Sequence, residues 1–246
     1  MPFKSEIIIE ETLERLSAAA AGLFAMRGRE CIQKKSRFTV ALSGGSTPKG
    51  MYRVLAGEPF LSETPWPGIH VWWVDERCVA PDNLWSNYGE AKRNFLDRVA
   101  LLPGHIHPMP AEMVPEQGAR SYEDELTRYF ELNAGEFPVF DLIFLGIGRD
   151  GHTASLFPGQ EGLKEKKRLV IAVKGGDPNV DRLTLTLPVL NRARQVVFLV
   201  SGKEKAEIVK AVLGPEKVSL PAQRVRPAKG RLTWILDQDA ASLISD

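Results

Sequence analysis

Short runs of apolar, often β-branched residues alternate along the chain with longer segments of helical period, and glycine, serine or aspartate separates the two. This alternation predicts a succession of βα units. The run over 196–200 is apolar at every position, which is typical of a parallel strand covered on both faces. The predicted strands are Phe38–Leu42, Val71–Val74, Asp141–Leu145, Leu169–Val173, Leu183–Leu187, Val196–Val200 and Thr233–Leu236.

The segments between these strands carry apolar residues three and four positions apart, as in a helix that buries one face. Leu13, Leu16 and Ala20 form such a stripe in the first segment. The predicted helices are Glu10–Lys34, Pro48–Ala56, Ser86–Val99, Pro115–Leu132 and Lys203–Leu213. We therefore expect an α/β fold with a mostly parallel sheet and helices on both faces, in a single domain over residues 1–246. A small separate lobe around 101–135 is the alternative.

Composition narrows the classes of function. The 246 residues carry a formal net charge of +1, whereas nucleic-acid and membrane-surface binders normally have a clear basic excess, so we expect a small-molecule partner. The two cysteines, Cys31 and Cys78, have neither the spacing of a disulfide framework nor that of a metal site. No export signal surrounds the apolar run 7–9, and no stretch approaches the roughly 18 apolar residues of a membrane span. These features predict a cytoplasmic protein.

The loop "SGGSTP" directly follows one predicted strand and precedes a helix. Gly44 and Gly45 let the backbone approach a ligand closely, and Ser43, Ser46 and Thr47 offer hydroxyl groups. The N-terminus of the following helix directs free N–H groups and a partial positive charge outward. Together these features predict a phosphate-binding loop, although the same residues also fit a plain turn with a Ser/Thr cap.

Charged residues gather at other strand ends. Asp75, Glu76 and Arg77 follow the aromatic strand "VWWV", where they can hold a polar substrate, and the guanidinium fork of Arg77 suits an oxyanion. Arg182 precedes one strand and Lys203 follows another, so either could bind a phosphate. Charges of this kind are also common on solvated loops, which is the alternative for all of them.

A GxGxxG pattern over 146–151 follows a strand and is similar to a dinucleotide fingerprint. The Phe-Pro-Gly at 157–159 interrupts the helix that such a fingerprint needs, so we do not expect a dinucleotide cofactor. The remaining pattern is a glycine loop, including Gly148, that presents Asp150 and His152. An exposed imidazole at this edge of a sheet can act as a general base, or it can be a hydrogen-bonded structural histidine.

Six motifs occur in order between residues 41 and 244: "ALSGGSTP", "WWVDERCVAPDNLWSNYGEAKRNFL", "FDLIFLGIGRDGHTASLFPG", "DRLTLTLPVLN", "SGKEKA" and "LPAQRVRP" with "LTWILDQDAASLI". In this combination the chain resembles the 6-phosphogluconolactonases, within the superfamily of glucosamine-6-phosphate deaminases and ribose-5-phosphate isomerases. The resemblance implies a Rossmann-like sheet, no cofactor, no metal, and hydrolysis of 6-phospho-D-glucono-1,5-lactone to 6-phospho-D-gluconate in the oxidative pentose phosphate pathway. The expected partner is this phosphosugar lactone, and the expected state is a monomer or weak homo-oligomer.

The resemblance also implies roles. His152 is the expected base for the attacking water, Asp150 supports it, and Arg77 stabilises the oxyanion or holds Asp150. The loop 43–47 is the expected phosphate site, with Arg182 and Lys203 as cationic clamps. Deaminases carry Tyr where this chain has Arg77 and an acidic residue after the DGH loop, where this chain has none. A deaminase or isomerase is the alternative enzyme, and a non-catalytic sugar-phosphate sensor the alternative outside catalysis.

Overall fold

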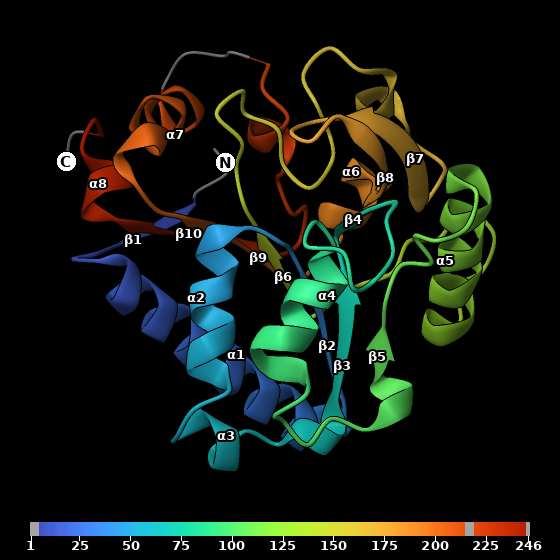
Figure 1. Cartoon of the computed structure of the whole chain (residues 1–246), viewed down its shortest axis with the longest axis horizontal. Coiled ribbons are helices and arrows are strands. Elements are labelled where there is room, and N and C mark those ends of the chain that lie inside the picture. The colour runs from blue at the N-terminus through green and yellow to red at the C-terminus, as the bar shows by residue number, and fades with distance from the viewer. Residues whose placement is uncertain (1–4, 215–218, 245–246) are drawn as a thin grey trace.

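The computed structural model describes residues 5–214 and 219–244. Two sheets and the helices around them make up this part of the chain (Figure 1). The strands are β1 Glu6–Glu10, β2 Phe38–Leu42, β3 Ile69–Trp73, β4 Asp75–Arg77, β5 Ile106–His107, β6 Leu142–Leu145, β7 Val170–Gly175, β8 Val180–Leu185, β9 Gln195–Val200 and β10 Arg231–Asp237. The helices are α1 Leu13–Lys35, α2 Ser46–Leu55, α3 Phe60–Glu63, α4 Asn87–Ala91, α5 Pro115–Phe130, α6 Leu187–Leu190, α7 Ala206–Leu213 and α8 Gln238–Ala241.

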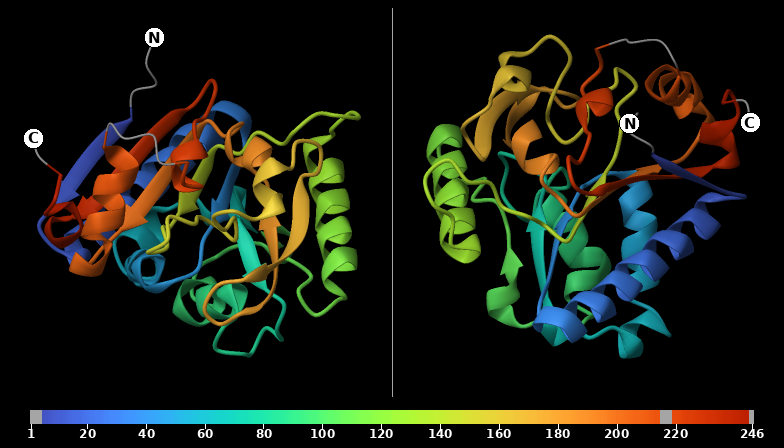
Figure 2. Two further views of the ribbon diagram at one scale, coloured as in Figure 1. Left: turned by 90° about the horizontal axis from the view of Figure 1, so that it is seen from above. Right: turned by 180° about the vertical axis from the view of Figure 1, so that it is seen from behind.

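The main sheet has seven strands in the order β1-β10-β9-β6-β2-β3-β5, and all of its pairings are parallel. Helices α1 and α2 lie on one face of it and α7 on the other (Figures 1 and 2). A second sheet, in the order β4-β8-β7, is antiparallel, and α5 packs against it. The α/β fold with a mostly parallel sheet is therefore confirmed. No helix in residues 5–214 or 219–244 is both long and apolar enough to cross a membrane.

Burial on both faces explains the central strands. All five residues of β2 and all six of β9 are buried, as the mainly apolar sequences of these strands predict. The stacked rings of Phe198 and Trp234, with centroids 4.0 Å apart, join β9 to β10 within this core. Burial of such large side chains supplies most of the free energy that holds the sheet together.

The predicted start of the first helix at Glu10 is wrong. Residues 6–10 pair with β10 as the edge strand β1, and α1 begins at Leu13, after the side chain of Thr12 accepts the backbone N–H of Arg15. The helix ends at Lys35 and is capped by Ser36, whose left-handed φ of 60° closes the last turn. A five-residue strand with three consecutive isoleucines, next to a long amphipathic helix, is difficult to separate from that helix by periodicity alone.

The predicted strands at 169–173 and 183–187 also differ from the structure. They correspond to β7 and β8, which pair antiparallel with each other rather than joining the parallel sheet. Strands β4 and β5 were not predicted, because strands of three and two residues have no measurable period. The small sheet lies beside the carboxyl end of the main one, since β4 begins two residues after β3 ends.

Candidate active site

Three loops meet at the carboxyl edge of the main sheet. They follow β2, β6 and β9, which are adjacent in the sheet, and they enclose a pocket of about 210 Å³. Helix α2 leaves β2 toward one face while α7 follows β9 on the opposite face (Figure 1). Helices that diverge in this way open a crevice, which is where open α/β sheets bind ligands. The small sheet adds a fourth wall through β4 and β8.

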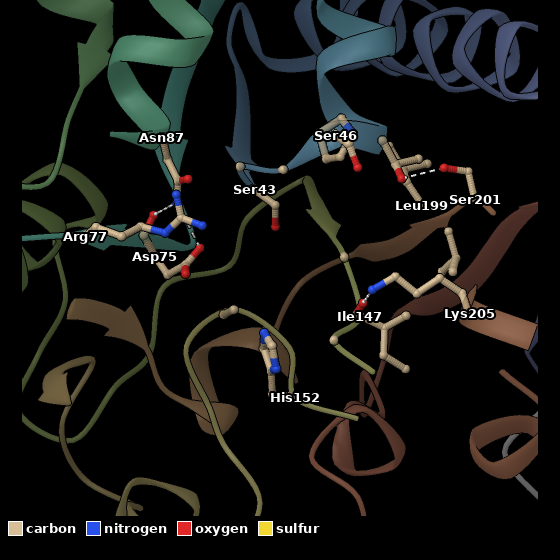
Figure 3. A pocket seen from close by; sticks show the side chains of 18 of the residues that line it. Ser43, Ser46, Asp75, Arg77, Asn87, Ile147, His152, Leu199, Ser201 and Lys205 are labelled. Carbon is tan, nitrogen blue, oxygen red and sulfur yellow. Dashed lines mark hydrogen bonds between the residues drawn. The ribbon is translucent and has the colours of Figure 1, made fainter. Parts of the chain in front are cut away.

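The loop after β2 delivers the N-terminus of α2 to the pocket. Gly45 takes a φ of 106°, a conformation that other residues rarely adopt, and it caps α2 without a side-chain hydrogen bond. Within the described residues the first-turn N–H groups of this ten-residue helix therefore have no side-chain acceptor, and Ser46 and Thr47 line the pocket beside them. The Thr47 hydroxyl lies 2.8 Å from that of Ser201 on the loop after β9 (Figure 3).

Hydrogen bonds fix the start of this loop. The buried Tyr52 hydroxyl donates to the Ser43 carbonyl over 2.5 Å, and the Ser43 hydroxyl donates to the Phe144 carbonyl on β6 over 3.0 Å. Gly44 lies so close to Asn87 that a Cβ atom would be 1.7 Å from Asn87 Oδ1. Gly45 is therefore needed for its positive φ, and Gly44 is needed because a Cβ atom at this position would collide with Asn87.

The loop after β6 presents His152 on the side of the pocket opposite Ser43 and Ser46 (Figure 3). Its Nδ1 lies 2.5 Å from Asp150 Oδ1, and the same oxygen accepts the His152 backbone N–H over 3.1 Å. Burial raises the pKa of Asp150, but the hydrogen bonds and charge of His152 outweigh this and lower the pKa overall. An ionised carboxylate only accepts hydrogen bonds, so Nδ1 carries a proton, and in the neutral form of the ring the lone pair is on Nε2.

Gly148 makes room for this pair. A Cβ on Gly148 would lie 2.0 Å from His152 Nδ1 and 2.7 Å from Asp150 Oδ1. The backbone N–H of Gly148 also donates to the His152 carbonyl over 2.9 Å, which closes the loop on itself. The ring of Phe157 packs against the imidazole with centroids 4.8 Å apart. Phe157, whose motif argued against a dinucleotide helix, thus supports His152.

The three charged residues of β4 do not all face the pocket. Asp75 and Arg77 line the pocket, whereas Glu76 does not. Asp75 is buried and accepts the Ser155 hydroxyl over 2.6 Å, and Arg77 Nη1 donates to the Trp85 carbonyl over 2.6 Å. Within the described chain no hydrogen bond or ion pair joins Arg77 to Asp150, and the proposal below therefore uses Arg77 only at the oxyanion.

Of the two predicted cationic clamps, Arg182 lies in the pocket lining and Lys203 does not. Arg182 lines the pocket, is only 3% exposed, and donates to the carbonyls of Gly175 and Pro178. Lys203 is exposed and lies outside the lining, whereas Lys205 lines it and donates to the Ile147 carbonyl over 2.8 Å (Figure 3). Burial lowers the pKa of both Arg182 and Lys205, as expected for cations drawn partly out of water.

The pocket thus gathers most residues that the motifs suggested. The predicted residues in its lining are Ser43, Gly44, Gly45, Ser46, Thr47, Asp75, Arg77, Gly148, His152 and Arg182. Asp150 lies behind His152 and outside the lining. Lys205, Asn87 and Ser201 line the pocket and were missed. Lys205 lies in the same motif as Lys203, and only the turn after Gly202 decides which lysine faces inward.

No group of three or more metal-ligating side chains that could hold a metal ion occurs within residues 5–214 and 219–244. His70, His105 and His107 do lie together, away from this pocket. Their rings stack, with His70 and His105 centroids 3.7 Å apart, and His107 Nδ1 lies 2.6 Å from Glu125. These contacts suit an aromatic packing cluster at the edge of the sheet.

Comparison with known proteins agrees with this geometry. Residues 11–234 match the family described as "Glucosamine-6-phosphate isomerases/6-phosphogluconolactonase". The chain is 44% identical to a 6-phosphogluconolactonase of Synechocystis sp., over 96% of this chain and 93% of the relative. It is 35% identical to the Rattus norvegicus 6-phosphogluconolactonase, over 99% of this chain and 95% of the relative.

Solved structures give the same grouping. A 6-phosphogluconolactonase from Trypanosoma cruzi superposes with a TM-score of 0.88 at 30% identity, covering 100% of this chain and 99% of that one. A monomeric glucosamine-6-phosphate deaminase superposes with a TM-score of 0.82 at 23% identity, over 97% of this chain and 100% of that one, which shows a shared fold. The chain belongs to the glucosamine-6-phosphate isomerase/6-phosphogluconolactonase family.

Proposed function

We propose that this chain is a 6-phosphogluconolactonase, which hydrolyses 6-phospho-D-glucono-1,5-lactone to 6-phospho-D-gluconate in the oxidative pentose phosphate pathway. The observation that carries the proposal is the His152–Asp150 pair, which faces the N-terminus of α2 across one pocket. The pair supplies a base, and the helix N-terminus supplies an anion site. A phosphorylated ester needs both. The names of the relatives identify the same substrate.

The phosphate end is the loop 43–47 with Lys205, whereas Arg182 pairs in register with Arg77 and reaches the ligand from that side. The N–H groups at the start of α2, which have no side-chain acceptor within the described chain, and the charge of Lys205 favour a dianion there. Lys205 takes the clamping role that the sequence analysis gave to Lys203, because it is the lysine in the lining. With the phosphate at this end, the lactone ring extends toward His152 and Arg77.

Hydrolysis then needs no covalent intermediate. Nε2 of His152 removes a proton from a water molecule, and that water attacks the lactone carbonyl carbon. The guanidinium of Arg77 stabilises the oxyanion that develops. The intermediate collapses as the bond from carbon to ring oxygen breaks, and the imidazolium returns its proton to that oxygen. Asp150 holds Nδ1 protonated throughout, which keeps the acceptor nitrogen on the substrate side.

Rates with three variants test this function. His152→Ala is expected to lose at least about 100-fold in kcat above the spontaneous background, the usual contribution of a general base. Asp150→Asn should lower kcat by a smaller factor than His152→Ala, because the imidazole remains in the pocket. A loss is still expected, because the amide can stabilise the tautomer with its proton on the wrong nitrogen. Lys203→Ala is the matched control, because this lysine is exposed outside the pocket. Near wild-type turnover by His152→Ala would refute the assignment of the base. Ammonia release from glucosamine 6-phosphate, without lactonase activity, would favour the deaminase alternative.

A further inference from the structure

Glu76 is a buried carboxylate that faces away from the pocket, between two residues that face into it. It is 2% exposed and lies on β4, where neighbouring side chains point to opposite sides. Within the described chain no cation forms an ion pair with it. Burial raises its pKa, and three backbone N–H groups act in the opposite direction. A buried charge is costly unless donors compensate it, so the arrangement of those donors needs an explanation.

Three of the four donors come from one short segment, residues 86–88. Oε1 accepts the backbone N–H groups of Arg77 over 2.8 Å and Asn87 over 2.7 Å. Oε2 accepts the N–H of Tyr88 over 2.7 Å and the hydroxyl of Ser86 over 3.1 Å. Ser86 also caps α4 by accepting the N–H of Gly89. Glu76 therefore fixes the position of the first turn of α4 against β4.

That turn carries two contacts to the pocket. The Asn87 amide donates to the Asp75 carbonyl over 2.9 Å, and its Oδ1 lies against Gly44 (Figure 3). One residue before the cap, the Trp85 carbonyl accepts Arg77 Nη1 over 2.6 Å. The Nε of Arg77 is buried without a partner, so within the described chain this carbonyl is the acceptor that orients the guanidinium.

Asn83 completes the link between Glu76 and the guanidinium. Its Oδ1 accepts the Trp85 N–H over 2.9 Å, and its carbonyl accepts the Ser86 N–H over 3.1 Å. The Trp85 peptide is thus held by a turn on one side and by the capped helix on the other. Its carbonyl has little freedom to move away from Arg77.

We propose that Glu76 is a positioning residue for the lactonase reaction, which aims the Arg77 guanidinium by holding the α4 turn and the Trp85 carbonyl in place. The inference rests on the proposed function of Arg77 at the oxyanion. Glu76 touches no substrate. Replacement of Glu76 should therefore lower kcat rather than raise KM, because Arg77 acts on charge that develops in the transition state.

Glu76→Gln tests the link with almost no change in shape. An amide keeps one oxygen, and in either orientation its NH₂ group faces a backbone N–H that the carboxylate now accepts. We expect kcat to fall at least about tenfold while KM changes less than about threefold. Asp141→Asn is the control for loss of a buried carboxylate: Asp141 is 4% exposed, accepts the Thr39 N–H and hydroxyl, pairs with Lys35 over 2.7 Å, and lies at the opposite end of the sheet. Its kcat should stay within about twofold of wild type.

A double-mutant cycle with Arg77→Lys separates positioning from general loss of structure. If Glu76 acts through the guanidinium, Glu76→Gln should cost less than about threefold in kcat once Arg77 is already Lys. Additive losses would overturn the inference while leaving Arg77 in its proposed role. Full activity of Arg77→Lys alone would refute that role and the inference with it.

If Glu76→Gln does not fold, Asn83→Ala carries the same cycle, because Asn83 is exposed and its side chain holds only the turn. We expect a loss of about three- to tenfold in kcat from Asn83→Ala alone and almost none in the Arg77→Lys background. An unchanged kcat in Asn83→Ala, or equal losses in both backgrounds, would overturn the inference.

Discussion

Replacement of Gly148 by alanine is the sharpest test of the His152–Asp150 pair. The added Cβ would lie 2.0 Å from His152 Nδ1 and 2.1 Å from its Cε1, whereas ordinary van der Waals contact begins near 3.4 Å. The imidazole would have to retreat by about 1.4 Å. The same Cβ would lie 2.7 Å from Asp150 Oδ1, so the pair cannot relax toward the carboxylate.

The cost should appear in catalysis far more than in stability. Misplacement of a reacting group by about 1 Å can cost 100-fold in rate, which corresponds to about 2.7 kcal/mol of lost transition-state stabilisation. Gly148 does not have a positive φ, so alanine is compatible with its backbone and gains about 0.4–1 kcal/mol by restricting the unfolded chain. This gain roughly offsets the partly exposed His152–Asp150 contact, which is worth about 0–1 kcal/mol.

We therefore expect Gly148→Ala to lower kcat/KM for 6-phosphogluconolactone about 100-fold, with a free energy of unfolding within about 1 kcal/mol of wild type. Initial rates corrected for spontaneous hydrolysis and urea titrations measure the two quantities. Gly104→Ala is the control, because a Cβ at Gly104 meets nothing within 4 Å. If Gly148→Ala kept more than half of the wild-type kcat/KM, the imidazole would not be acting from the observed position.

Three further predictions concern the cations and the histidine cluster. Lys205→Ala should raise KM for the phosphorylated lactone at least about tenfold but leave hydrolysis of unphosphorylated gluconolactone nearly unchanged, whereas Lys203→Ala should stay within about twofold for both. Arg182→Met should also lower the free energy of unfolding by about 1–2 kcal/mol in urea titrations, since the carbonyls of Gly175 and Pro178 each lose a charged donor while the Pro178 carbonyl keeps the Val180 N–H. Burial holds the pKa of His70 near 4 rather than 6.5, so the unfolded chain takes up the proton first. The free energy of unfolding should keep the full contribution of neutral His70 above pH 6.5 and should fall by on the order of 1–2 kcal/mol as the pH drops toward 4. The fall should be smaller in His70→Asn.

The sequence predicted the loops around the site better than the side chains within them. "SGGSTP" follows an apolar run that forms β2 over the predicted residues, so the position of the loop followed from the strand that precedes it. The choice between Lys203 and Lys205 did not, because it depends on a turn at Gly202 with a φ of 95°. Asn87 was missed for a different reason: it is uncharged, and its role depends on contacts with Gly44 and Asp75, which are distant in sequence.

The elements of the fold differ in the same way, because some are specified by their own residues and others by contacts with distant residues. Long amphipathic helices and fully apolar strands are specified by their own residues, and α5 starts at Pro115 as predicted. The pairing of β7 with β8, and of β8 with β4, depends on which strands meet across the small sheet. The apolar content of 169–173 cannot distinguish this arrangement from a place in the parallel sheet.

The nearly neutral chain can still attract a dianion, because of how the cations of the pocket are held. Arg77, Arg182 and Lys205 each donate to backbone carbonyl oxygens, and within the described residues none of them forms an ion pair with a carboxylate. A carbonyl orients a cation without cancelling its charge, so the full charge remains available to a ligand. Asp75, the carboxylate in the lining, accepts from Ser155 and Asn87 instead. Some cations elsewhere do pair with acidic side chains, as Arg168 does with Glu123, so a net charge of +1 for the whole chain is compatible with a pocket whose cations are free of such pairs within the described residues.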